Sequence, residues 1–296
     1  MGILSQRSGH AHRASKLKES SSTAFNTFET EVLNNLYQLS LHSKPGSLEE
    51  IYTFSWIQTS LHILPNIDRS FAKFIAEIDY PVTKWKTFHA EEYLKGNLSL
   101  LDHFNCISSS LNHMSLACME LLHALSLAKS SVPAMLKNLK EIQVWGTKKT
   151  FEEDQEQEKV CSEKEMMVYK ALLIRNHVKN WVCRIVDSSI RGDGGGIVHE
   201  LGGVCNSSLI KFKFSVCEGM KKKGFVKEVG DINRGVMRLF VAGTEGDYRE
   251  EIMEVTERVE VLGKMLQMVK EDVNKLFSDS MVKRDELINS FEQCKH

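Results

Sequence analysis

The fold is decided by residues 252–276, IMEVTERVEVLGKMLQMVKEDVNKL. Apolar residues recur there at alternating steps of three and four, a spacing that lines one side of an α-helix with apolar groups. The stripe runs through Ile252, Val255, Val259, Leu262, Leu266, Val269, Val273 and Leu276. Val261, Met265 and Met268 widen it beyond a two-helix seam. The pattern therefore predicts a long helix, from about residue 247 to 277, that packs inside a bundle rather than in a free dimer.

A second stretch has the same spacing and predicts a partner for the first. It runs through Leu100, Phe104, Ile107, Leu111, Met114, Cys118, Leu121, Leu125 and Ala128. Neither helix can bury its stripe alone, so we expect the last helix to dock onto the 100–128 helix or its neighbours in the same chain. The predicted fold class is all-α: an elongated bundle of long antiparallel helices with a disordered N-terminal tail.

Composition agrees with a helical interaction protein. The 296 residues are 42% apolar and 26% charged and include only four prolines, which favours helices over a loop-rich β fold. A formal net charge of -1 argues against a nucleic-acid partner. Seven cysteines without a CxxC pair suit reduced thiols better than a disulfide framework. No apolar run reaches the roughly 20 residues needed to cross a bilayer, so integral membrane insertion is not expected.

The chain divides into four predicted segments. Residues 1–22 are basic and Ser-rich and read as a disordered tail, with an organelle transit peptide as the alternative. Residues 23–147 form an N-terminal helical region, in which Ser47-Leu48-Glu49-Glu50 has the form of a capping box. Residues 148–165 read as an acidic linker, and residues 166–296 as a C-terminal helical region that packs on the N-terminal one, so that both could be one domain.

Finer boundaries follow from helix-breaking residues. Pro65 is expected to separate two helices, and a short helix is expected to restart at Pro133 and to carry Leu139 and Ile142. Six glycines between Gly192 and Gly203 predict a loop. Residues 207–217 fit both a strand and a helix; the helical surroundings favour a helix.

No catalytic, cofactor-binding or metal-binding residue is predicted. The glycine loop lacks the lysine and hydroxyl of a phosphate-binding loop and does not match the dinucleotide fingerprint. His103 and Cys106 lie one turn apart, but zinc needs about four ligands and no second pair is near in sequence, so Cys106 and Cys118 are interpreted as small buried hydrophobes. Lys221-Lys222-Lys223 is interpreted as a solvated face, with a contact to anionic lipid headgroups as the alternative.

One segment resembles a known plant family. Ser55-Trp56, then FAKFIAEIDYPVTKW over residues 71–85, then Tyr93-Leu94, Leu100-Leu101-Asp102 and Cys106 are similar to motifs of the BYPASS family. Those motifs are a Ser-Trp in an early helix, a Pro-Val-x-x-Trp turn, a Tyr-Leu pair and a Leu-Leu-Asp-x-Cys-Asn helix. Order and spacing in this last element differ here, where the chain reads LDHFNC over residues 101–106. The resemblance covers roughly residues 25–145.

The resemblance implies an all-α, non-enzymatic regulator of plant development, in a family associated with restraining a root-derived signal that arrests shoot growth. No catalytic residue or cofactor is carried over. The leading hypothesis is an adaptor or regulator that contacts protein partners in the cytoplasm. The alternative is a peripheral membrane or secretory-trafficking factor at an endomembrane, or a plastid protein. A cryptic enzyme acting on a small signalling metabolite is a third hypothesis.

Overall fold

Residues 4–41, 53–144, 162–193, 210–211, 216, 226–242 and 248–293 are described by the structure, a computed structural model. The side chains of α1 are described over residues 20–39, and those of α8 as far as Phe291. The elements are α1 (Leu4–Leu41), α2 (Phe54–Glu77), η1 (Val82–Lys84), α3 (Thr87–Ser126), η2 (Leu127–Lys129), α4 (Val132–Asn138), α5 (Glu163–Arg191), α7 (Lys227–Ala242) and α8 (Arg249–Gln293). More than half of the chain is helical and no described residue is in a strand, which confirms the all-α prediction.

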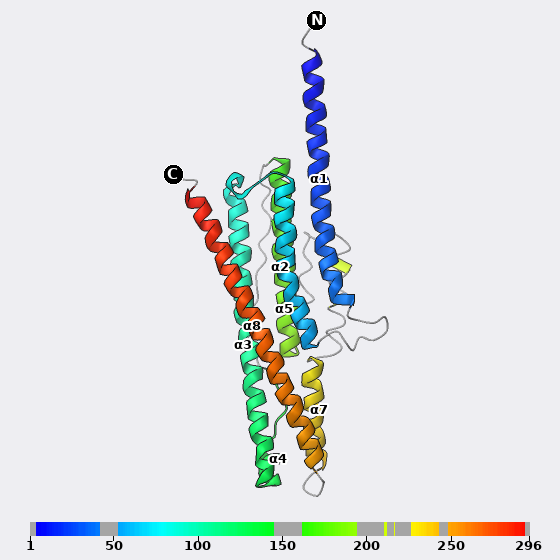
Figure 1. Cartoon of the computed structure of the whole chain (residues 1–296), viewed down its shortest axis with the longest axis vertical. Helices are drawn as coiled ribbons and strands as arrows, with labels where there is room; N and C mark the ends of the chain where they lie inside the picture. Colours follow the sequence, from blue (N-terminus) through cyan, green and yellow to red (C-terminus); the bar gives the residue numbers. More distant parts are fainter. Residues whose placement is uncertain are drawn as a thin grey trace.

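The described helices lie lengthwise along one axis (Figure 1). α2 runs antiparallel to α1 and to α3, and α8 runs antiparallel to α7 and α3. Not every pair of neighbouring helices is antiparallel as predicted, however, because some neighbouring pairs are parallel. Ser110 of α3 bonds to Asp187 of α5, while the starts of the same two helices meet at His89 and Glu165. α2 and α8 also run in the same direction.

The predicted stripes form the centre of the bundle. On α8 the residues at the three-four spacing are buried from Val255 to Leu276, and Ile252 is partly buried. The expected widening of the stripe is not seen, because Val261 and Met268 are exposed and only Met265 is partly buried. On α3 the stripe is buried from Leu100 to Leu125, and Ala128 is partly buried. α8 lies against α3, α2 and α7. Lys270 of α8 also donates to the Ser115 hydroxyl of α3 (Nζ–Oγ 2.8 Å), so the predicted docking of the last helix within the same chain is confirmed.

Two features of the N-terminal half differ from the expectations. The predicted disorder of residues 1–22 differs from the structure, in which the backbone of α1 is helical from Leu4. Extending a helix costs far less than starting one, and no proline precedes Pro45, so α1 continues outward from its packed part. Pro65 does not separate two helices, because α2 continues through it. Leu61, Leu64 and Ile67, all buried, hold the chain in the bundle on both sides of the missing hydrogen bond.

Other boundaries are corrected or lie outside the described residues. α4 ends at Asn138, before Leu139 and Ile142, which are buried but not helical. Residues 148–161 of the predicted linker are not described, and α5 already begins at Glu163, capped by Ser162. Ser47–Glu50 lie outside the described residues; the N-cap of α2 is Thr53. Gly192 ends α5 in a left-handed conformation (φ 71°), and of residues 207–217 the three described ones, Ile210, Lys211 and Val216, are helical.

Candidate functional site

A carboxylate shared by three cations lies where α2, α5 and α8 meet. Asp68 of α2 accepts from Arg175 Nε (2.8 Å) and Lys179 Nζ (2.8 Å) of α5 through Oδ1, and from Lys283 Nζ (2.7 Å) of α8 through Oδ2. The side chains of Arg175 and Lys179 are only 2% and 4% exposed, whereas Lys283 is 38% exposed. Arg175 and Lys179 stand one turn apart on α5, which places both on the same face. Asp68 and these three cations, here called the charged centre, therefore link α2, α5 and α8 through ion pairs.

The guanidinium of Arg175 is held between aromatic rings. Its Cζ atom lies 4.6 Å from the centroid of Tyr93 and 5.9 Å from that of Phe71, distances at which a cation is attracted to the ring face. The terminal nitrogens donate to the side-chain oxygens of Asn176 (2.8 Å) and Asn97 (3.2 Å). Three of its five donors are thus used, and its position is fixed by α2, α3 and α5.

Close helix packing places Asn176 beside this arginine. A Cβ atom at Gly96 would lie 2.1 Å from Asn176 Cγ, so only glycine lets α3 and α5 approach this far. Asn176 in turn donates to the backbone oxygen (2.9 Å) and Oε1 (2.8 Å) of Glu92. The glycine is therefore part of the site's support, although it contacts no charged group of the centre.

Burial and charge act in opposite directions on this centre. Burial alone would raise the pKa of Asp68, but the charges of Arg175, Lys179 and Lys283 outweigh it and hold that pKa well below its usual range. Burial lowers the pKa of Lys179 to about 8, and the attraction of Asp68 only partly offsets it. Asp68 is thus always ionised near neutral pH, while Lys179 titrates just above it.

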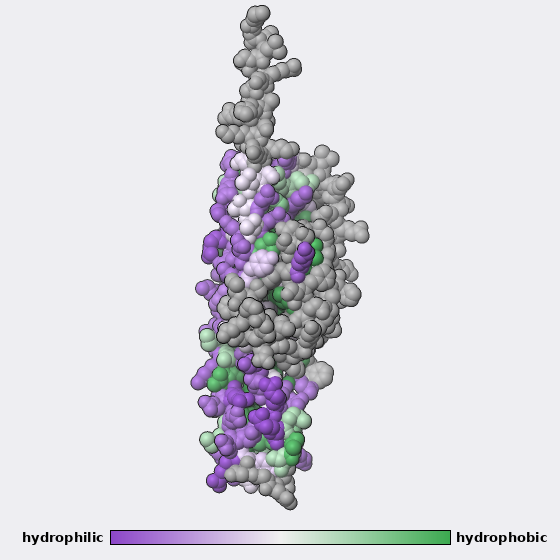
Figure 2. All heavy atoms as spheres, turned by 90° about the vertical axis from the view of Figure 1, so that its right-hand side faces the viewer, coloured by the Kyte–Doolittle hydropathy of each residue, from purple (hydrophilic) through white to green (hydrophobic). Residues whose placement is uncertain are grey.

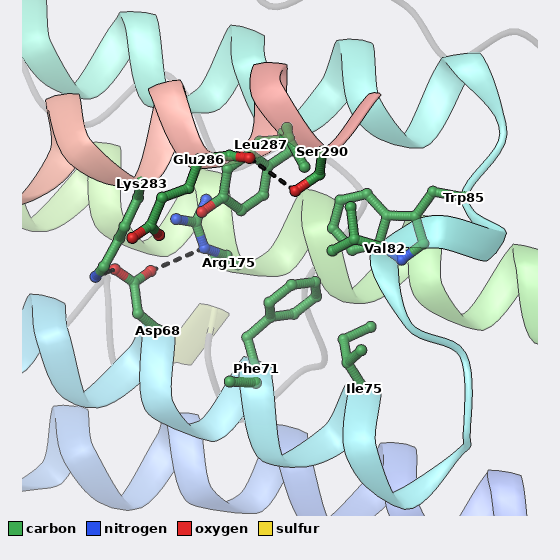
Figure 3. A pocket seen from close by; sticks show the side chains of 12 residues that line it. Asp68, Phe71, Ile75, Val82, Trp85, Arg175, Lys283, Glu286, Leu287 and Ser290 are labelled. Atoms are coloured by element: carbon green, nitrogen blue, oxygen red, sulfur yellow. Dashed lines mark hydrogen bonds and ion pairs between the residues drawn. The ribbon is translucent and has the colours of Figure 1, made fainter. Parts of the chain in front are cut away.

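A pocket of about 380 Å³ opens beside the charged centre. Figure 3 shows Asp68, Arg175 and Lys283 at one end of it and Val82, Trp85 and Ile75 at the other, with Phe71 between them. Leu287 of α8 completes the apolar wall. Ala72 and Glu286 also line the pocket and are exposed, so the pocket reaches the surface of the bundle. Its volume falls in the range of about 300–1,000 Å³ that is typical of small-molecule sites.

The turn between α2 and α3 builds the apolar end of the pocket. Pro81 precedes η1, and Trp85 directly follows it, packing edge-on to Phe71 (centroids 6.3 Å) and beside Tyr93 (5.8 Å). The indole nitrogen of Trp85 donates to the Tyr80 carbonyl oxygen (3.3 Å), which fixes the ring. These residues belong to the segment that resembles the BYPASS family, so that segment supplies half of the pocket lining.

Two cysteines of the described bundle are buried thiols. Burial raises the pKa of the Cys118 thiol to about 11 and that of Cys183 to about 12, so neither is a thiolate at neutral pH. Cys118 is buried as predicted, whereas Cys106 is only partly buried. In the described part of the chain, no three His, Cys, Asp or Glu residues are grouped as metal ligands. Nor is any described helix both long and apolar enough to cross a membrane.

Sequence reasoning missed the charged centre and the pocket. Arg175 and Lys179 flank the apolar stripe of α5 at i, i+4, the one local signal that could have pointed to a buried ion pair. Asp68 stands beside Ile67 on a helix whose other face is solvated, a position that normally holds a surface carboxylate. Lys221–Lys223, the suggested lipid contact, lie outside the described residues.

A second surface feature lies on α7. Met237, Phe240 and Val241 are 47%, 40% and 82% exposed and stand at i, i+3 and i+4, so they form one apolar patch, here called the α7 patch. The opposite side of α7 buries Val229, Ile232, Val236 and Leu239 against the bundle. Figure 2 shows a face that is largely hydrophilic in its described part, with hydrophobic side chains in its lower third, where α7 lies.

Known proteins resemble this chain only in part. No family model matches it, and no solved structure matches it. UPF0496 protein 4 of Oryza sativa, from both the indica and the japonica subspecies, is 27% identical over 128 residues, which are 43% of this chain and 26% of the relative. Protein BPS1, chloroplastic, of Arabidopsis thaliana is 26% identical over 111 residues, 38% of this chain and 31% of the relative.

The similarity therefore spans about a quarter to a third of the curated relatives. It agrees with the resemblance that the Pro81-Val82-x-x-Trp85 turn and its neighbours indicated. The chain is a distant homologue of the plant proteins UPF0496 protein 4 and BPS1.

Proposed function

We propose that the protein is a non-enzymatic helical regulator, or adaptor, of plant development that acts by contacting other proteins. The observation that carries this proposal is the α7 patch, in which three apolar side chains lie together on the solvent side of an otherwise well-packed helix. Contiguous exposed apolar groups beside charged ones are typical of protein interaction sites. Arg234 and Arg238, 69% and 50% exposed, flank the patch and would supply its polar rim.

Other observations support a regulator over an enzyme. Cys118 and Cys183 are protonated thiols at neutral pH, and the ionised groups around Asp68 bond to one another rather than being left for proton transfer. The distant similarity to BPS1 favours a role in growth signalling between root and shoot. The compartment proposed is the cytoplasm, with the plastid as the alternative because that relative is described as chloroplastic.

Proximity labelling in living plant cells tests the proposal. The full chain fused to a labelling enzyme is compared with the Met237→Ser, Phe240→Ser double variant and with Met253→Ser as control. Met253 is 71% exposed on α8 but lies outside the α7 patch. We expect the double variant to lose a defined set of labelled proteins that the control retains. An unchanged set would refute the α7 patch as the contact surface.

A peripheral membrane factor is the competing proposal, because an apolar patch beside two arginines could also enter a lipid surface. Co-sedimentation with vesicles that contain phosphatidylserine separates the two. Membrane binding through arginine should fall as salt is added. Salt-sensitive binding that the double variant loses would favour the membrane role over the adaptor.

A further inference from the structure

The pocket between α2, α5 and α8 has two chemically different ends. One end presents cations around Asp68, and the other presents the rings and aliphatic groups of Phe71, Ile75, Val82 and Trp85 (Figure 3). Pockets of this kind hold the apolar part of a ligand by burial and orient it through a few polar groups. The arrangement thus specifies both a size and a charge for the occupant.

Positive charge is in excess at the polar end. Three cations share the single carboxylate of Asp68, which balances only one of them. Two further carboxylates are near: Glu286 lines the same pocket, and Asp279 lines a smaller hollow with Lys179 and Lys283. Both belong to exposed residues, and among the described ion pairs neither lies within reach of these cations. Water therefore screens them far more than Asp68.

The arginine at this end retains the means to bind an anion. Nε of Arg175 bonds to Asp68, and one hydrogen of each terminal nitrogen bonds to an asparagine, so two of its five donors are left in the described bundle. Arg175 lines the pocket together with Lys283, whose ammonium bonds to Asp68 through only one of its three donors. Buried charges are stabilised by partners of opposite sign, and an added carboxylate would provide one.

We propose that this pocket binds a small organic anion that carries a carboxylate on an apolar, preferably aromatic, body. The carboxylate lies against Arg175 and Lys283, and the body lies between Phe71, Trp85 and Leu287. This site is separate from the α7 patch, so it adds a ligand to the proposed regulator. Residues of α2, α3, α5 and α8 all line or support it, and a bound anion would join these helices more firmly.

Calorimetric titration of the purified full chain tests the proposal with matched probes. The two probes are 2-naphthoate and 2-naphthamide, which share a ring system and differ in charge. We expect 2-naphthoate to bind and the amide to bind about tenfold more weakly, the difference expected for one charge-assisted contact. Equal binding of the two probes, or no binding of 2-naphthoate to the folded chain, would overturn the proposal.

Two pairs of variants locate the binding. Lys283→Gln should weaken 2-naphthoate about tenfold and leave the amide unchanged, while Lys264→Gln, an exposed lysine of the same helix, should change neither. Ala72→Phe fills the pocket from its exposed rim and should abolish binding of both probes, while Ala76→Phe, one turn on and outside the pocket, should not. Circular dichroism and melting temperature establish that each variant is folded. Binding that survives Ala72→Phe in a folded protein would place the ligand elsewhere.

Discussion

Asp68→Asn keeps the shape of the side chain, yet it should be among the most destabilising single substitutions in this chain. Among the described residues, Asp68 has the only carboxylate that pairs with Arg175, Lys179 and Lys283, and its substitution leaves two cations that are almost completely buried. Removing one partner of a buried ion pair typically costs about 3–5 kcal/mol, because the other charge remains without compensation. The exposed Lys283 can turn to water, so the cost arises mainly from Arg175 and Lys179.

Urea denaturation followed by far-ultraviolet circular dichroism gives the free energy of unfolding. Glu31→Gln is the matched control, because Glu31 pairs with Lys73 (2.6 Å) between α1 and α2 with both side chains substantially exposed, and such pairs contribute about 0–1 kcal/mol. Part of the stability lost in Asp68→Asn should be recovered at higher pH, where Lys179 releases its proton and no longer carries an uncompensated charge. Equal small effects of the two substitutions would refute the reasoning that the Asp68 centre is a buried, mutually dependent cluster.

Three further predictions concern single positions. Burial lowers the pKa of Lys179 from 10.5 to about 8, so the unfolded chain binds more protons than the folded one between these pH values. The free energy of unfolding should therefore rise as pH rises through that interval. Lys179→Met should remove this rise in denaturation curves measured across the same range. Gly263→Ala should stabilise by about 0.5–1 kcal/mol, since a Cβ atom there meets nothing within 4 Å and alanine favours the helix; a lower melting temperature would contradict it. Gly96→Ala should destabilise by about 1–3 kcal/mol, because its Cβ atom would overlap Asn176, and a variant as stable as the parent would show that α3 and α5 are not so closely packed.

The parts of the fold that follow from periodicity were predictable. The α3 and α8 stripes repeat at helical spacing for about seven turns, and this spacing predicts which of their residues are buried. Helix ends predicted from single helix-breaking residues were less reliable. Pro65 should end a helix by its own chemistry, yet burial of Leu61, Leu64 and Ile67 around it outweighs the loss of one hydrogen bond.

The candidate site could not be predicted for a different reason. Asp68, Arg175 and Lys283 are far apart in the sequence, and each alone has the pattern of a solvated charge on a helix. Only the packing of α2 against α5 and α8 brings these three residues together. Which apolar stripes face each other decides how the helices pack, and no single segment of the sequence encodes that choice. The same holds for Trp85, which follows η1, and Leu287 of α8, which both line the pocket.

Because α8 folds back within its own chain, the α7 patch, rather than the α8 stripe, is free for partners. Leu266, 1% exposed in the middle of the stripe, tests this directly. The measurement is the free energy of unfolding of Leu266→Ala, taken with the molecular mass from sedimentation equilibrium. A loss of about 2–5 kcal/mol at unchanged mass is the predicted result. Unchanged stability together with lost self-association or lost partner labelling would contradict it, because the stripe would then be an external interface.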